Sequence, residues 1–527
     1  MTDFAIRRYA DIRKALLARE ELALLDVREE APFAEAHPLF AANISLSRLE
    51  LEVLARVPRK DTRVTVYDDG EGLAAIAVER LQTLGYTDVA LLEGGLQGWR
   101  DAGGELFKDV NVPSKSFGEL VDAERHTPSL AAEEVQALLD AKADVVVLDA
   151  RRFDEYQTMS IPGGISVPGA ELLLRVRELA PDPQTQVIVN CAGRTRSIIG
   201  TQSLVNAGIP NPVSALRNGT IGWTLAGQTL EHGQDRRFKP VSAHNKNLAI
   251  EAARAVAKRA NVSRIGLAEW RRWQADPART TYLFDVRTPE EFAAGHLPGS
   301  RSTPGGQLVQ ETDHFASVRG ARLVLVDDDN VRANMSASWL AQMGWQVSVL
   351  DDLNPSDFSE QGPWQPPLPT APAAEEISPQ TLADWLKEPG TEVLDFTASA
   401  LYVQRHIPGA WWVLRSQLQA ALANIPPARR YVLTCGSSLL ARWVVPQLQA
   451  LTERPVVVLR GGTSAWIEAG LPVQASPQHP ASPRIDRYRR PYEGTDNPRE
   501  AMQGYLDWEY GLVAQLGRDG THGFFVI

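Results

Sequence analysis

The sequence predicts an α/β protein built from four similar units, each a mostly parallel sheet covered by helices on both faces. Two observations predict this class. A pattern of short apolar strands, polar loops and helices with short connections occurs four times along the chain. The length of 527 residues also exceeds the roughly 250–300 residues at which one hydrophobic core stops growing.

Each unit begins with a short apolar strand that ends in aspartate. An aromatic residue follows a few positions later, and three units then continue into a Pro-Gly turn. The aspartates are Asp26, Asp149, Asp285 and Asp395, and the aromatic residues are Phe33, Tyr156, Phe292 and Tyr402.

The second and third strands of each unit are continuous apolar runs, which are typical of strands buried on both faces. We expect the second strands at 64–67, 187–190, 323–326 and 431–434, and the third at 89–92, 213–216, 347–350 and 456–459. A helix connects the two strands. In three units a glycine turn and a tryptophan follow the third strand, at Trp99, Trp223 and Trp466.

The repeats divide the chain into four predicted domains, three linkers and a tail. The domains are 1–108, 129–231, 263–358 and 376–475, the linkers are 109–128, 232–262 and 359–375, and the tail is 476–527. The last linker is rich in proline and should be stiff and extended. The tail should contain a helix within 498–516 and pack across the domains.

Composition excludes several classes of protein. The net charge of −11 argues against a nucleic-acid or anionic-membrane binder, because such surfaces need basic stripes. The apolar runs are too short to span a bilayer, and the first residues lack the apolar core of a signal peptide. Two cysteines fit a reducing compartment, so we expect a cytoplasmic protein. No Cys/His cluster suggests a metal or another cofactor.

Both cysteines occupy the same position of the repeat, directly after the second strand. The four residues at this position are Asp68, Cys191, Asp327 and Cys435. Random placement would rarely produce this coincidence, so the cysteines are expected to have a chemical role.

The loop after Cys191 is suited to holding an anion next to the sulfur. It lies between a strand end and a helix start, where backbone N–H groups and the helix dipole create positive potential. The loop residues are Ala192, Gly193, Arg194, Thr195, Arg196 and Ser197. We expect this environment to lower the pKa of Cys191 and to bind an anionic substrate, with Arg194 facing it. Asp149 and Arg151 should support the loop from behind.

Together these motifs resemble the rhodanese family of sulfurtransferases over about residues 5–475. The resemblance implies a five-stranded parallel sheet in each domain and a persulfide on Cys191. Arg196 lies five positions after Cys191, the sulfurtransferase spacing. The related dual-specificity phosphatases resemble a spacing of six, where this chain has Ser197.

The function implied is transfer of a sulfur atom from thiosulfate, or a related small anionic donor, through Cys191 to cyanide, a thiol or a sulfur-accepting protein. Mercaptopyruvate and small persulfides remain open as donors. The alternative is a multidomain scaffold or sulfur-carrier binding protein with little catalysis.

The other three domains depart from this pattern. Cys435 is a candidate second nucleophile, although its loop has no arginine at either spacing and Arg442 comes one position later. Asp68 and Asp327 cannot carry a persulfide, and their acidic loops should repel anions. Such acids could chelate Ca²⁺ or Mg²⁺, but we favour two non-catalytic domains with solvated acids.

Overall fold

The computed structural model describes residues 4–527 and contains four five-stranded sheets, one in each repeat. All paired strands within them are parallel. The strand order is the same each time, as in β1-β5-β4-β2-β3 of the first sheet. The predicted fold class is therefore confirmed, and we number the domains 1 to 4 along the chain.

Domains 1 and 2 have the same succession of elements and are joined by helix α6 (Val112–Arg125). Domain 1 contains β1 (Ile6–Arg7), α1 (Tyr9–Leu17), β2 (Ala23–Asp26), α2 (Glu30–Glu35), β3 (Ala41–Asn43), α3 (Leu49–Arg56), β4 (Val64–Tyr67), α4 (Leu73–Thr83), β5 (Val89–Leu92) and α5 (Gly95–Asp101). Domain 2 contains β6 (Ser129–Leu130), α7 (Ala132–Asp140), β7 (Val145–Asp149), α8 (Phe153–Thr158), β8 (Ile165–Ser166), α9 (Leu172–Leu179), β9 (Gln186–Asn190), α10 (Thr195–Asn206), β10 (Val213–Leu216) and α11 (Gly219–Leu225).

Domain 4 repeats this order, and domain 3, which follows helix α12 (Ala243–Arg259), departs from it by an extra helix before its fourth strand and by the lack of an α-helix after its last strand. Domain 3 contains β11 (Ser263–Ile265), α13 (Leu267–Gln274), β12 (Thr281–Asp285), α14 (Pro289–Ala294), β13 (Arg301–Ser302), α15 (Gly305–Gln310), α16 (Thr312–Phe315), β14 (Arg322–Val326), α17 (Arg332–Gln342) and β15 (Gln346–Leu350). Domain 4 contains β16 (Glu376–Ile377), α18 (Pro379–Trp385), β17 (Thr391–Asp395), α19 (Ser399–Tyr402), β18 (Trp411–Trp412), α20 (Leu418–Leu422), β19 (Arg430–Thr434), α21 (Leu439–Gln449), β20 (Val456–Leu459) and α22 (Gly462–Glu468).

The predicted strands agree closely with the observed ones. The runs at 64–67, 89–92, 213–216 and 456–459 form strands with those bounds. The other four begin one residue earlier, because a polar residue joins the parallel ladder ahead of the apolar run. These residues are Gln186, Arg322, Gln346 and Arg430.

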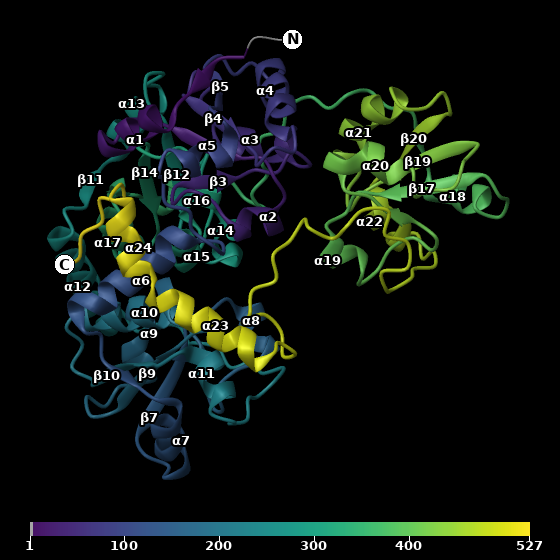
Figure 1. Ribbon diagram of the computed structural model, residues 1–527. Coiled ribbons are helices and arrows are strands. Elements are labelled where there is room, and N and C mark those ends of the chain that lie inside the picture. The colour runs from purple at the N-terminus through teal and green to yellow at the C-terminus, as the bar shows by residue number, and fades with distance from the viewer. Residues whose placement is uncertain (1–3) are drawn as a thin grey trace.

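The C-terminal tail forms two helices, α23 (Arg499–Tyr510) and α24 (Leu512–Asp519), where one was predicted. In Figure 1 they are the yellow helices that run across α6 and domain 2. Helix α23 contacts α11 and α6, and α24 packs on α6. The tail therefore covers the side of domain 2 where α10 and α11 begin.

Each cysteine domain packs against an aspartate domain. On the cysteine domains, the contacting residues lie in the segments that directly follow the edge strands β8 and β18. Between domains 2 and 3, Gly169 approaches Gly306, and Arg332 donates to Glu171 at 2.7 Å. Between domains 4 and 1, Arg415 makes a two-pronged ion pair with Glu50, at 2.6 and 2.9 Å. Domain 1 also shares a continuous apolar core with domain 3.

None of the helices within residues 4–527 is both long enough and apolar enough to cross a membrane.

The Arg415–Glu50 pair should be a main support of the contact between domains 1 and 4, because both side chains are buried. Glu50→Gln leaves the Arg415 charge buried without its partner, and we expect a loss of about 3–5 kcal/mol in chemical denaturation. The exposed pair Arg63–Glu20 is the matched control, and Arg63→Ala should cost at most about 1 kcal/mol. Equal effects of the two substitutions would contradict this assignment.

Candidate active site

In three domains the same backbone contact holds the residue that directly follows β4, β9 or β19. The carbonyls of Asp68, Cys191 and Cys435 each accept a hydrogen bond at 2.9 Å from an N–H in the first turn of the following glycine-led helix. The glycine just before each donor, namely Gly95, Gly219 and Gly462, has positive φ, and a Cβ there would clash with that carbonyl. The glycine turn seen in the sequence therefore sets the position of the cysteines.

A backbone amide at the start of the next helix points back at the side chain six residues earlier, which is the residue at the cysteine position of the repeat. Ala74 N–H donates to the Asp68 carboxylate at 2.9 Å, and Ala333 N–H donates to Asp327 at 2.7 Å. In domain 2 the amide at this position belongs to Ser197, whose hydroxyl donates to the Arg194 carbonyl at 2.8 Å. The N–H and the hydroxyl of Ser197 both act to lower the pKa of the Cys191 thiol. This amide can thus hold an acceptor at the position, and in domains 1 and 3 an aspartate side chain fills the place. Burial and the neighbouring Asp329 raise the pKa of Asp327, so Asp329, whose pKa Arg332 lowers, carries the negative charge of that loop.

Arg196 is fixed beside this cradle by Glu155 of α8. Its two terminal nitrogens donate to the two carboxylate oxygens at 2.8 and 2.9 Å. Burial alone would raise the pKa of Glu155, but Arg196 lowers it to about 2. Domain 3 keeps the same pair, Arg332 with Glu291, so the pair also closes a loop that lacks cysteine.

Asp149 and Arg151 form a buried pair behind the loop. Arg151 donates to both carboxylate oxygens of Asp149, at 2.9 and 2.7 Å, and to the carbonyl of Met159. Asn190, the last residue of β9, donates to Asp149 at 2.9 Å. The pair therefore joins the ends of β7 and β9 directly before Cys191.

Arg194 points away from the sulfur, contrary to the expectation that it faces an incoming anion. Its guanidinium donates to Glu119 at 2.7 and 2.8 Å and to Asp122 at 2.9 Å, both on α6. The ring of Tyr510 lies 4.2 Å from it. Arg194 anchors the loop to the linker and the tail, since its charge is neutralised there.

The remaining loop residues face other elements. Thr195 contacts α6 at Gly118, and Ala192 belongs to an apolar cluster with Tyr505 and Leu506 of α23. At Gly193, a Cβ would lie 3.1 Å from the Tyr505 ring and 3.4 Å from a Glu509 oxygen. Helix α23 therefore lies directly on the loop.

This cover changes the electrostatics of Cys191. The residue is 1% exposed, and burial raises the pKa of its thiol although Arg196 and Ser197 act to lower it. The expected lowered pKa is therefore wrong for the structure with α23 in place. The sequence of the loop alone favours a thiolate, and no motif in the tail marks α23 as a neighbour of the loop.

Glu509 is a further residue of the site that sequence reasoning missed. It is fully buried, and one carboxylate oxygen accepts from Tyr505 at 2.8 Å while the other has no hydrogen-bond partner. Burial and the nearby Glu119 raise the pKa of Glu509 to about 8.

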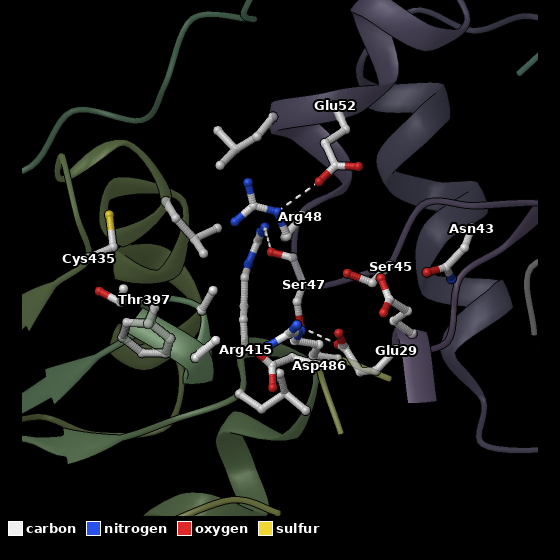
Figure 2. A pocket seen from close by; sticks show the side chains of 18 of the residues that line it. Glu29, Asn43, Ser45, Ser47, Arg48, Glu52, Thr397, Arg415, Cys435 and Asp486 are labelled. Atoms are coloured by element: carbon white, nitrogen blue, oxygen red, sulfur yellow. Dashed lines mark hydrogen bonds and ion pairs between the residues drawn. The ribbon is translucent and has the colours of Figure 1, made fainter. Parts of the chain in front are cut away.

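Cys435 has different surroundings. It borders a cavity of about 740 Å³ between domains 1 and 4, and Arg48 of domain 1 lies on the same cavity. Figure 2 shows Cys435 on the wall formed by domain 4, with Arg48 reaching into the space from the other side. Arg48 reaches this cavity because domain 1 packs against domain 4, and no motif in the Cys435 loop predicts its presence.

The acidic loops of domains 1 and 3 hold no metal-binding arrangement: in the part of the chain that the structure describes, no group of three His, Cys, Asp or Glu side chains is placed to hold an ion.

Comparison with known proteins identifies the family. The model of the Rhodanese-like domain matches residues 10–102, 131–226, 267–352 and 378–469, together more than half of the chain. The chain therefore belongs to the rhodanese family, with four such domains in tandem.

The similarity to a solved structure extends over nearly the whole chain. The crystal structure of thiosulfate sulfurtransferase from Pseudomonas aeruginosa is 76% identical, covers 99% of this chain and 100% of its own, and has a TM-score of 0.99.

Two curated relatives match single domains. An uncharacterized protein of Synechocystis is 32% identical over 98 residues, which are 19% of this chain and 54% of that protein. An HTH-type transcriptional regulator of Mycobacterium tuberculosis is 31% identical over 90 residues, 17% of this chain and 39% of that protein. The chain thus matches about half or less of these relatives' own length.

The raised pKa of Glu509 predicts that docking of α23 depends on pH. The pKa of Glu509 rises from its ordinary value of 4.5 to about 8 in the docked helix. Its contribution to the stability of the docked helix is therefore complete below the ordinary value and is lost as pH rises through about 8. After correction for intrinsic exchange, hydrogen-exchange protection of residues 499–510 should fall as pH rises from 4.5 to about 8 and should level off above that value.

Glu509→Gln is the matched variant, because the amide keeps the shape of the side chain and cannot ionise. Its protection in the same helix should be independent of pH over this range. The same loss of protection in both proteins would show that another group controls the helix.

Proposed function

We propose that this protein is a thiosulfate sulfurtransferase whose nucleophile is Cys191. The observation that carries the proposal is the full-length similarity to a protein of that name at 76% identity. The anion-holding loop around Cys191 supports the choice of residue, because it combines a thiol, the Ser197 amide and a fixed arginine.

The first half-reaction loads the cysteine. The Cys191 thiolate attacks the outer sulfur of thiosulfate, the new S–S bond forms at Sγ, and the S–S bond of the donor breaks to release sulfite. Arg196 and the Ser197 amide stabilise the negative charge as it moves from the thiol to the persulfide. They are already oriented, so little reorganisation is needed.

The second half-reaction returns the thiol. Cyanide, or a thiolate from a small molecule or an accepting protein, attacks the outer sulfur of the Cys191 persulfide. Its new bond to carbon or sulfur replaces the S–S bond, and the Cys191 thiolate is regenerated. The route is ping-pong, needs no cofactor and suits the reducing cytoplasm, where we place the protein.

Access to Cys191 requires α23 to move, because Tyr505 and Glu509 cover the loop. Ionisation of Glu509 at alkaline pH would leave a second negative charge in a buried site near Glu119, where Lys115 and Arg194 offset it only in part, and would loosen this cover. We therefore expect donor entry to follow opening of the tail helix.

Cys191→Ser should lower thiosulfate:cyanide transfer by at least about 100-fold, since a covalent nucleophile is lost. Cys435→Ser is the matched control and should retain nearly all of this activity. Circular dichroism would verify that both variants fold. Substantial activity in Cys191→Ser, together with loss in Cys435→Ser, would exchange the roles of the two residues.

Arg196→Ala should lower kcat/KM for thiosulfate by about 100-fold, the usual effect of removing one preorganised donor of charge stabilisation. Arg196→Lys should recover only part of this loss, because lysine cannot reproduce the two-pronged contact with Glu155. Steady-state kinetics measure both. Unchanged kinetics in Arg196→Ala would remove this arginine from the proposed site.

A further inference from the structure

Domain 4 lacks three charged side chains that domain 2 has at corresponding positions, and its cavity of about 740 Å³ is wider than the one of about 430 Å³ that these side chains border in domain 2. Arg151, Glu155 and Arg196 of domain 2 correspond by register to Thr397, Leu401 and Leu440. All three replacements border the cavity. The whole Arg–Glu arrangement has been removed, and the lining near the sulfur has become apolar.

The backbone that presents Cys435 is nevertheless intact. The Cys435 carbonyl accepts from Thr463 N–H at 2.9 Å, the same contact that Cys191 makes with Thr220. Helix α21 begins at Leu439, and its dipole favours negative charge at the loop. The thiol therefore occupies the nucleophile position of the fold, with a roomier and less polar space in front of it.

The missing positive charge is replaced from another domain. Arg48 lies directly before α3 of domain 1, and its Nε donates to Glu52 at 2.7 Å. Its terminal nitrogens make no hydrogen bond within residues 4–527, and its side chain is 48% exposed on the cavity side. Burial opposes the charge of Arg48, but Glu52 and, to a smaller extent, the neighbouring Cys435 raise its pKa.

The cavity also offers an unsatisfied acceptor. One carboxylate oxygen of Asp486, in the tail segment that borders the cavity, is buried without a hydrogen-bond partner, while the other accepts from Ser399 N–H at 2.7 Å. Arg48 thus offers the cavity terminal nitrogens without a hydrogen-bond partner among the described residues, and Asp486 offers a carboxylate oxygen without one.

We propose that Cys435 and Arg48 form a second sulfur-transfer site, which accepts the hydropersulfides of amino-acid-like organic thiols. The cavity volume lies in the range of pockets for small organic ligands and greatly exceeds the space that thiosulfate needs. Arg48 would bind the carboxylate of the substrate, Asp486 its ammonium group, and the apolar wall its carbon chain. This inference rests on the proposed function only in that both sites carry sulfane sulfur.

The reaction is a balanced exchange that needs no oxidant. The Cys435 thiolate attacks the outer sulfur of R–S–S–H, a bond forms between Sγ and that sulfur, and the S–S bond of the donor breaks. The products are Cys435–S–S–H and the thiolate R–S⁻. The reverse reaction delivers the sulfur to a small thiol.

Loading of Cys435 can be measured in the Cys191→Ser protein, where it is the remaining cysteine. The probes are glutathione hydropersulfide and thiosulfate, and the readout is the intact mass with peptide mapping. We expect a gain of one sulfur on Cys435 from the hydropersulfide and almost none from thiosulfate. No sulfur from the hydropersulfide, or equal loading by both donors, would overturn the proposal.

Arg48→Ala in the same background should slow loading by about 10- to 100-fold, which corresponds to one hydrogen bond to a charged group. Arg48→Lys should recover part of the rate, and Arg63→Ala, an arginine of domain 1 outside the cavity, is the control. Equal loading rates in Arg48→Ala and Arg63→Ala would remove Arg48 from the site.

The double substitution Leu401→Glu with Leu440→Arg provides an independent test, because it restores the pair that domain 2 uses. It should narrow the cavity and shift loading of Cys435 from the hydropersulfide toward thiosulfate. If Cys435 still preferred the hydropersulfide over thiosulfate to the same degree, the loss of the Arg–Glu pair could not explain its donor specificity. Thiosulfate:cyanide activity of the wild-type protein and of Cys435→Ser reports on Cys191, so failure of either site can be recognised separately.

Discussion

One backbone amide at the start of a helix governs the chemistry of this protein. It points at the side chain six residues earlier, directly after β4, β9 or β14, and it favours a hydrogen-bond acceptor or an anion there. Asp68 and Asp327 fill this place with their own carboxyl groups. Cys191 fills it with a sulfur that can be loaded and unloaded. The aspartate domains therefore retain the same cradle and occupy it permanently.

Pairing of the domains extends this arrangement. Cys191 has its arginine within its own loop, whereas Cys435 lies beside an arginine that domain 1 supplies. A domain without a nucleophile thus contributes charge to the site of its partner. The two cysteine sites then differ mainly in what surrounds the sulfur: a tail helix over Cys191, and a wide cavity before Cys435.

Much of the fold could be predicted from the sequence, because strands buried on both faces are continuous apolar runs and the repeats confirm one another. The positions of Cys191 and Arg196 followed from local spacing. Glu509 and Arg48 could not be predicted, since both reach their sites through contacts between segments hundreds of residues apart. The pKa of Cys191 was predicted in the wrong direction for the same reason: the loop alone favours a thiolate, and the distant helix that buries it reverses the balance.

The order of the domain pairs has a consequence for how the chain folds during synthesis. Domains 2 and 3 are neighbours in sequence and can associate as soon as both have left the ribosome. Domain 1 must keep the partner-facing side around Glu50 uncovered until Arg415 of domain 4 emerges, 365 residues later. The pairs are therefore nested, and the cavity at Cys435 is completed only after the inner pair exists. Newly made chains consequently pass through an interval in which the face of domain 1 is open to the wrong partner.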